Sequence, residues 1–182
     1  MLENKKILVT GLLNHRSIAY GVAKAMYREA VEPAFTFQGE GVRERAEKLA
    51  SEFDAKVNLP CDVASGEEIA GLFGKLAQSW DGLDGIVHAI AYAPREALAG
   101  DFHAAVTREN VRITLDISAC RLAALVKGGL PLMQGRNAAV VAVTYLGAVR
   151  AVPNYNVMVL PRQALKHATA IWHSVSGRWA SV

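Results

Sequence analysis

Short apolar runs and amphipathic stretches alternate along this chain. The apolar runs are rich in β-branched residues and lack a polar face, which is typical of strands that a parallel sheet buries on both sides. The stretches between them repeat apolar residues every three or four positions, as amphipathic helices do. The expected strands are Lys6–Thr10, Ala34–Phe37, Lys56–Leu59, Gly85–His88 and Ala138–Val143. The expected helices are Ser17–Arg28, Val42–Phe53, Gly66–Trp80 and about Ala104–Val126.

Strand–helix alternation of this kind predicts an α/β fold with a doubly wound parallel sheet of the Rossmann type. No internal repeat, low-complexity tract or linker interrupts the pattern, so we expect a single dinucleotide-binding domain over residues 1–182. In such sheets the ligand crevice lies beyond the carboxyl ends of the strands. The residues that directly follow each strand are therefore the candidates for a functional site.

Composition excludes several classes of protein. The net charge of +3 is too small to favour a nucleic-acid partner, and the apolar runs are too short to cross a membrane. The first residues lead directly into a strand without the layout of a signal peptide. Cys61 and Cys120 show neither disulfide nor metal-ligand spacing, so we expect two reduced thiols in a cytoplasmic protein without a metal.

The turn after the first strand, TGLLNHRSIAYG (10–21), opens onto a helix. Gly11 suits a tight turn and a close approach of the backbone to a phosphate. Ser17 is placed to cap the helix, whose free N–H groups favour a pyrophosphate. However, the ordinary dinucleotide fingerprint has three closely spaced glycines, and only Gly11 and Gly21 are present. The motif alone is weak, and a cap without a ligand explains Ser17 equally well.

The second strand ends at Gln38, where an acidic residue would bind the adenine ribose hydroxyls. No arginine directly follows it to bind a 2′-phosphate, and Arg43 and Arg45 are expected to start the next helix. This pattern favours NADH over NADPH. After the third strand, Asp62 is placed either to accept a hydrogen bond from the adenine amino group or to cap the helix near Gly66.

The fourth strand leads into HAIAYAP, residues 88–94. The small Ala89 and Ala91 allow a flat ligand to pass close to the backbone. We interpret His88 as a satisfied core histidine rather than a catalytic base.

Two tyrosines follow the fifth strand. Tyr145 and Tyr155 lie ten positions apart around an expected turn at Pro153-Asn154. At the carboxyl edge of a sheet, such a pair can donate hydrogen bonds to a substrate oxygen. Packing at the edge of the core is the alternative interpretation.

The following motifs occur in order: KILVTG-x5-SIAYG, FTFQ, PCDV, WDGLDGIVHAIAYAPREAL, TRENVR, LDIS and YLGAVRAVPNYNVM. Together they resemble the NADH-dependent enoyl-acyl-carrier-protein reductases of bacteria, a branch of the short-chain dehydrogenase/reductase superfamily. The resemblance runs from about residue 5 to residue 158, and residues 159–182 form a divergent tail. We therefore expect a C-terminal part that is truncated, and a sheet that is incomplete at its C-terminal edge.

The resemblance implies a hydride transfer from NADH to the β-carbon of a trans-2-enoyl thioester carried by acyl carrier protein. It also implies the family's usual homotetramer. Ala93 would meet the substrate, Tyr155 would donate a hydrogen bond to the thioester carbonyl, and Tyr145 would flank the substrate. The implied cofactor contacts are Gly11, Ser17 and Ile18 at the pyrophosphate, Gln38, Asp62 and Val63 around the adenosine, and Ile90 in the cleft.

Several positions depart from the family pattern. Residues 89–92 read Ala-Ile-Ala-Tyr where the family usually has Ser-Ile-Gly-Phe, and Val159 replaces a glycine. Arg162 stands where the family has a lysine that binds the nicotinamide ribose, and an arginine differs from lysine in reach and hydrogen-bond geometry. Pro161 falls inside the expected helix, at a cost of roughly 3 kcal/mol or more.

These departures leave two alternatives open. One is another short-chain alcohol or ketone reductase, although the Tyr-x3-Lys pair of that group is absent. The other is an inactive remnant of a reductase that at best binds nucleotide.

We predict a one-base deletion near codon 159 as the origin of the divergent tail. If one base is added before a permitted set of codons for residues 161–182, the shifted frame reads AKASLEACNRYLAFSLGALGIR. That string restores a lysine at the position of Arg162 and a helix without proline. Sequencing of the coding DNA decides the matter, because codons around Val159 that do not permit this shift would exclude the deletion.

Overall fold

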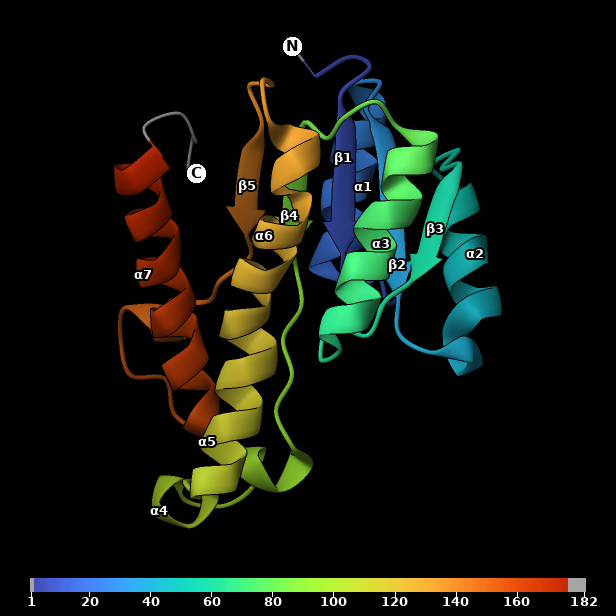
Figure 1. The fold of residues 1–182 in the computed structure, drawn as a ribbon. Coiled ribbons are helices and arrows are strands. Elements are labelled where there is room, and N and C mark those ends of the chain that lie inside the picture. The colour runs from blue at the N-terminus through green and yellow to red at the C-terminus, as the bar shows by residue number, and fades with distance from the viewer. Residues whose placement is uncertain (1, 177–182) are drawn as a thin grey trace.

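A computed structural model describes residues 2–176, with the backbone alone over 171–176. Five parallel strands form one sheet in the order β3-β2-β1-β4-β5 (Figure 1). The strands are β1 (Lys6–Thr10), β2 (Glu32–Phe37), β3 (Val57–Pro60), β4 (Gly85–His88) and β5 (Ala139–Ala142). The α-helices are α1 (Ile18–Arg28), α2 (Arg43–Ser51), α3 (Gly66–Ser79), α4 (Phe102–Ala105), α5 (Arg108–Leu115), α6 (Arg121–Met133) and α7 (Val159–Ser176). None of the helices in the described part of the chain has the length and apolar character that a membrane crossing requires.

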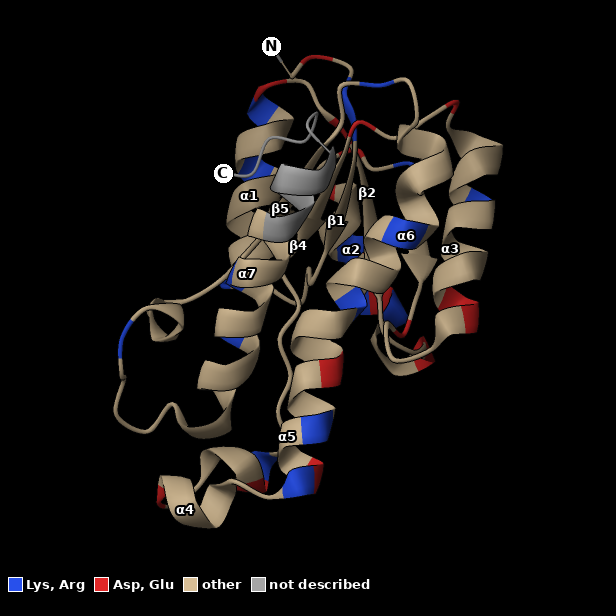
Figure 2. Ribbon diagram, turned by 60° about the vertical axis from the view of Figure 1, so that its left-hand side comes forward, with Lys and Arg blue, Asp and Glu red and all other residues tan. Residues whose placement is uncertain are grey.

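The predicted doubly wound parallel sheet is confirmed. Its strands are apolar on both sides because helices cover both faces: Figure 1 shows α3 and α6 in front of the sheet and α1 behind it. Charged residues lie mainly in the loops and helices and hardly at all in the strands (Figure 2). The direction in which the strand order grows reverses between β1 and β4. This is the point at which open α/β sheets bind ligands.

The helical region before β5 differs from its prediction. The Thr107 hydroxyl accepts a hydrogen bond from the backbone N–H of Asn110 (3.1 Å), so α5 begins at Arg108 and a separate short helix, α4, precedes it. A π-helical turn, η3 (Asp116–Cys120), joins α5 to α6. The periodicity of the sequence indicated the helical region but not the cap and the wider turn within it.

The expectation that Pro161 disrupts the helix of the tail is wrong. A short 3₁₀ turn, η5 (Asn156–Met158), leads directly into α7, and Pro161 is the third residue of α7. The first N–H groups of a helix have no partner within it, so a proline there removes no intrahelical hydrogen bond. The last part of the tail that the sequence analysis set apart, 177–182, lies outside the described residues.

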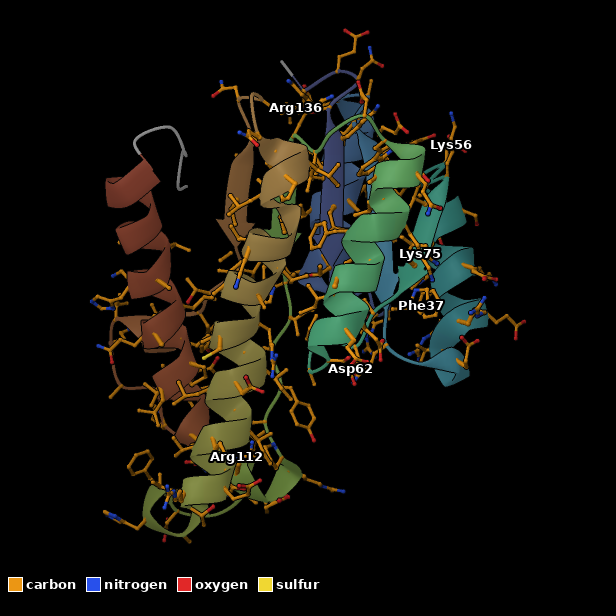
Figure 3. The ribbon with its side chains drawn as sticks, viewed as in Figure 1. Phe37, Lys56, Asp62, Lys75, Arg112 and Arg136 are labelled. Atoms are coloured by element: carbon orange, nitrogen blue, oxygen red, sulfur yellow. The ribbon has the colours of Figure 1, made fainter. Side chains whose placement is uncertain are left out.

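A buried carboxylate joins three strands at the edge of the sheet opposite to their carboxyl ends. Asp84 accepts hydrogen bonds from Lys5 Nζ (3.1 Å), the Lys6 backbone N–H (2.9 Å) and Arg136 Nη1 (3.2 Å). Arg136 lies at that edge in Figure 3. Burial by itself raises the pKa of Asp84, but these donors outweigh it and hold the pKa below its usual range. Asp84 is thus ionised and links the starts of β1, β4 and β5.

We predict that Asp84→Asn lowers the free energy of unfolding by about 1.5–3 kcal/mol at neutral pH, because it removes the charge that three donors share. The depressed pKa means that this contribution is present above about pH 4 and is lost as pH falls through the lower pKa of the folded state. Urea denaturation of both proteins at several pH values tests this.

Asp81→Asn is the matched control, because Asp81 also contacts Lys6 and Arg136 but its side chain is 74% exposed. It should have a much smaller effect. A difference between the Asp84 variant and the wild type that grows toward acid pH would contradict the assignment.

Candidate active site

A cavity of about 540 Å³ opens at the carboxyl ends of β1, β2, β3 and β4, a size typical of small-molecule sites. Figure 3 labels Phe37, the last residue of β2, and Asp62, which follows β3. Five residues that the sequence analysis assigned to the cofactor line the cavity together: Gly11, Gln38, Asp62, Val63 and Ile90. The predicted position of a ligand crevice thus coincides with a cavity in the structure.

The first side of the cavity depends on the absence of a side chain at Gly11. Its φ of +86° lies in the left-handed region, and a Cβ atom there would lie 2.3 Å from the carbonyl oxygen of Ala89. Two loops, one after β1 and one after β4, therefore touch through their backbones. Glycine is required for this contact between loops, whatever the cavity binds.

Ser17 and Ile18 do not line the cavity. The Ser17 hydroxyl accepts a hydrogen bond from the backbone N–H of Tyr20 (3.3 Å) and donates one to the Asn14 carbonyl (2.7 Å). Ser17 is thus the N-cap of α1, as predicted. Ile18 is 62% exposed. Their assignment to the pyrophosphate stays a prediction.

A polar pair forms the opposite wall. Gln38 Nε2 donates a hydrogen bond to Asp62 Oδ2 (3.0 Å), and Asp62 Oδ1 accepts one from the backbone N–H of Ala64 (2.9 Å). Asp62 does not cap α3, because the hydroxyl of Ser65 accepts the hydrogen bond from Glu68 N–H. Beside this pair, burial and then the nearby carboxylates raise the pKa of the Cys61 thiol to about 12, so Cys61 is a neutral part of the wall.

A second group of side chains lies after β5, at the same edge of the sheet. The rings of Tyr145 and Tyr155 are 4.7 Å apart between centroids. Arg162 Nε donates a hydrogen bond to the Tyr155 hydroxyl oxygen (3.0 Å), and Arg162 Nη1 donates one to the carbonyl of Val143 (2.9 Å). One guanidinium thus connects the Tyr155 hydroxyl to the end of the strand. The sequence placed Tyr145, Tyr155 and Arg162 as candidates, and the structure brings all three together.

Gly147 belongs to this group although the sequence analysis did not select it. A Cβ atom at Gly147 would lie 2.7 Å from the ring of Tyr155, so the ring packs directly on the backbone of the turn η4 (Leu146–Ala148). The glycine within YLGAV is the only trace of this contact in the sequence.

His88 is fully buried, which confirms its predicted place in the core. The prediction that it is satisfied is wrong, because neither ring nitrogen has a hydrogen-bond partner among the described residues. Burial, and then the nearby charge of Arg162, lower the pKa of His88 to about 4. The imidazole is therefore neutral at physiological pH.

Ala93 lies outside the cavity lining and packs against Ala97, Ala105 and Val157. Its contact with a substrate stays a prediction. Conversely, the cavity lining includes residues that the sequence analysis did not select. These residues are Leu13, Thr36, Phe37, Cys61 and Ile117. They are apolar residues or strand residues, and nothing in the sequence separates such residues from those of the core.

Comparison with known proteins identifies the family. The family model for enoyl-(acyl carrier protein) reductase matches residues 11–174. The chain belongs to the enoyl-acyl-carrier-protein reductase family. The match reaches beyond residue 158, so it includes part of the tail that the sequence analysis set apart.

Individual members of this reductase family agree with that assignment. The enoyl-acyl-carrier-protein reductase (NADH) FabI of Neisseria meningitidis is 50% identical over 165 residues, which are 91% of this chain and 63% of that protein. The corresponding protein of Haemophilus influenzae is 45% identical over 97% of this chain and 67% of its own length. The chain thus spans about two thirds of the length of the curated relatives that it matches.

Solved structures of the family share the fold. The NADH enoyl-acyl-carrier-protein reductase of Aquifex aeolicus superposes with a TM-score of 0.94 at 40% identity, over 99% of this chain and 71% of that one. The reductase of Anaplasma phagocytophilum, solved in complex with NAD, gives a TM-score of 0.91 at 30% identity, over 97% of this chain and 68% of that one.

We predict that Gly11→Ala destabilises the protein more than Gly39→Ala does. Both glycines have positive φ, so both variants incur a backbone cost of roughly 1–3 kcal/mol. Only at Gly11 does the new methyl group meet another backbone, whereas nothing lies within 4 Å at Gly39. Chemical denaturation should show an additional loss of about 1 kcal/mol or more for Gly11→Ala. Equal losses would mean that the two loops do not touch as described.

Proposed function

We propose that the chain is an NADH-dependent enoyl-acyl-carrier-protein reductase of fatty acid synthesis. The observation that carries the proposal is the Tyr155 hydroxyl, held by Arg162 at the same sheet edge as a cavity of about 540 Å³. Tyrosine hydroxyls are hydrogen-bond donors suited to a carbonyl oxygen, and the family match supports this chemistry.

The cavity residues suit a dinucleotide. Gly11 keeps the first loop close to the fourth strand, Gln38 and Asp62 offer polar groups to the adenosine, and Val63 and Ile90 supply apolar wall. Ser17 and Ile18, at the start of α1, would serve the pyrophosphate, since the first N–H groups of a helix favour anions. Bound NADH would supply a hydride to the β-carbon of a trans-2-enoyl thioester, and a proton from solvent would then add to the α-carbon of the resulting enolate.

Tyr155 would polarise the thioester carbonyl. Its oxygen already accepts a hydrogen bond from Arg162 Nε, so its own proton remains available for donation to the substrate oxygen. As negative charge develops on that oxygen, a donor fixed in place stabilises it without reorganisation. The guanidinium of Arg162 adds a positive charge beside the tyrosine.

The remaining substrate contacts are apolar. The Tyr145 ring lies against Tyr155 and is half exposed, which would place it beside the acyl thioester. Ala93, in the loop after β4, would contact the acyl chain of the substrate. We infer that the substrate is carried by acyl carrier protein, as the family name implies, and that the assembly is the homotetramer usual for the family.

We predict that the purified 182-residue chain oxidises NADH only when a short trans-2-enoyl thioester is present. Tyr155→Phe should lower kcat about 100-fold or more, because it removes the donor to the developing oxyanion. The dissociation constant for NADH should change little, since Tyr155 does not line the cavity. Stopped-flow absorbance and fluorescence titration measure the two quantities separately.

Tyr145→Phe is the matched control. It makes the same chemical change, loss of one tyrosine hydroxyl, and it keeps the ring that packs on Tyr155. It should retain most of the activity. NADH binding without any enoyl-dependent oxidation would overturn the proposed reaction and leave a nucleotide-binding protein. Oxidation of NADH with a ketone instead of the enoyl thioester would favour another short-chain reductase.

A further inference from the structure

A charged pair lies beside the part of the cavity assigned to the adenosine. Phe37, the last residue of β2, and Gln38 both line the cavity. The chain then turns at Gly39 (φ +74°) into the 3₁₀ turn η1 (Glu40–Val42), and α2 follows from Arg43. Glu40 and Arg43 thus follow the cavity residues closely in the chain, although neither belongs to the cavity lining.

The guanidinium of Arg43 makes contacts on two sides, and the pair is partly open to solvent, with the side chains of Arg43 and Glu40 46% and 73% exposed. The Nε and Nη2 atoms of Arg43 donate to the two carboxylate oxygens of Glu40, both at 2.6 Å. Its Cζ atom lies 5.5 Å from the centroid of the Phe37 ring. The planar guanidinium therefore has a defined position, because it binds a carboxylate through two hydrogen bonds and lies over an aromatic ring. The hydrogen bonds from Arg43 also lower the pKa of Glu40, so the pair is ionised at neutral pH.

NADH and NADPH differ only by the phosphate on the 2′-oxygen of the adenine ribose. In dinucleotide-binding folds, an arginine near the end of the second strand binds that phosphate. Arg43 has the right chemistry and lies next to Phe37, but Glu40 already occupies two of its donors. A 2′-phosphate at this place would compete with a carboxylate for the same fork and would meet its negative charge.

We propose that Glu40 is a specificity-determining residue, which excludes NADPH by pairing with the arginine that would otherwise bind the 2′-phosphate. The inference rests on the proposed function and deepens it. Selectivity for NADH then comes from the ion pair between Glu40 and Arg43. An acidic residue that binds the adenine ribose hydroxyls is not needed at the position of Gln38.

The test compares nucleotide affinities of four proteins: the 182-residue chain, Glu40→Gln, Glu44→Gln and the double variant Glu40→Gln with Arg43→Gln. Glu44→Gln is the matched control, since it removes the same charge from the same segment and Glu44 has no hydrogen bond to Arg43 within the described residues. Calorimetry measures binding of NADH, NADPH, ADP and 2′,5′-ADP. The last two nucleotides report on the adenosine end without any reaction.

Glu40→Gln should tighten the binding of NADPH and of 2′,5′-ADP about tenfold or more, and should leave NADH and ADP within about twofold. Glu44→Gln should change every affinity by less than about threefold, as expected for an exposed charge. The double variant should lose the gain, because the phosphate then has no guanidinium to bind. Circular dichroism confirms that all four proteins are folded alike.

Three results would overturn the inference while the proposed function stands: the unchanged chain binds NADPH as well as NADH, Glu40→Gln brings no selective gain, or the gain persists without Arg43. If none of the folded proteins binds any of the four nucleotides, the cofactor site itself fails, and both proposals fail with it.

Discussion

The burial of the sheet on both faces is the constraint on which the rest of the structure depends. Strands that are apolar on both sides leave no place for polar chemistry except at their ends. Because all five strands are parallel, the loops after them meet at one edge, and the cavity and the Tyr145–Tyr155–Arg162 group both lie there. The opposite edge carries the charged network around Asp84, which serves the fold.

The sheet could be predicted from the sequence because its strands are local apolar patterns. Lys6–Thr10 and Gly85–His88 agree with the structure at both ends, and no end of the other three strands differs by more than two residues. The helices before and after β5 were less predictable, since their starts depend on a side-chain cap at Thr107 and on the turn Asn156–Met158 that leads directly into α7. Such features are set by single hydrogen bonds and by the exact register of the helix start.

In the candidate site, too, local sequence motifs could be predicted and contacts between distant residues could not. Residues in motif positions after the strands, such as Gly11, Gln38 and Asp62, could be found from the sequence, and they meet in the cavity. What the sequence could not provide is which side chains bind one another. The hydrogen bond of Arg162 to Tyr155 and the position of Arg43 over the ring of Phe37 depend on how separate elements are placed in space. The unsatisfied His88 is another result of placement, because its surroundings come from several parts of the chain.

The network around Asp84 also has a kinetic meaning. Its hydrogen bonds join residues that lie 79, 78 and 52 positions apart in the sequence. Parallel sheets fold slowly because each strand pairing must close a long crossover before any contact compensates for the lost chain entropy. The Asp84 carboxylate acquires all its donors only when β1, β4 and β5 stand side by side. The burial and pairing of this carboxylate therefore require that the order of these three strands is already fixed.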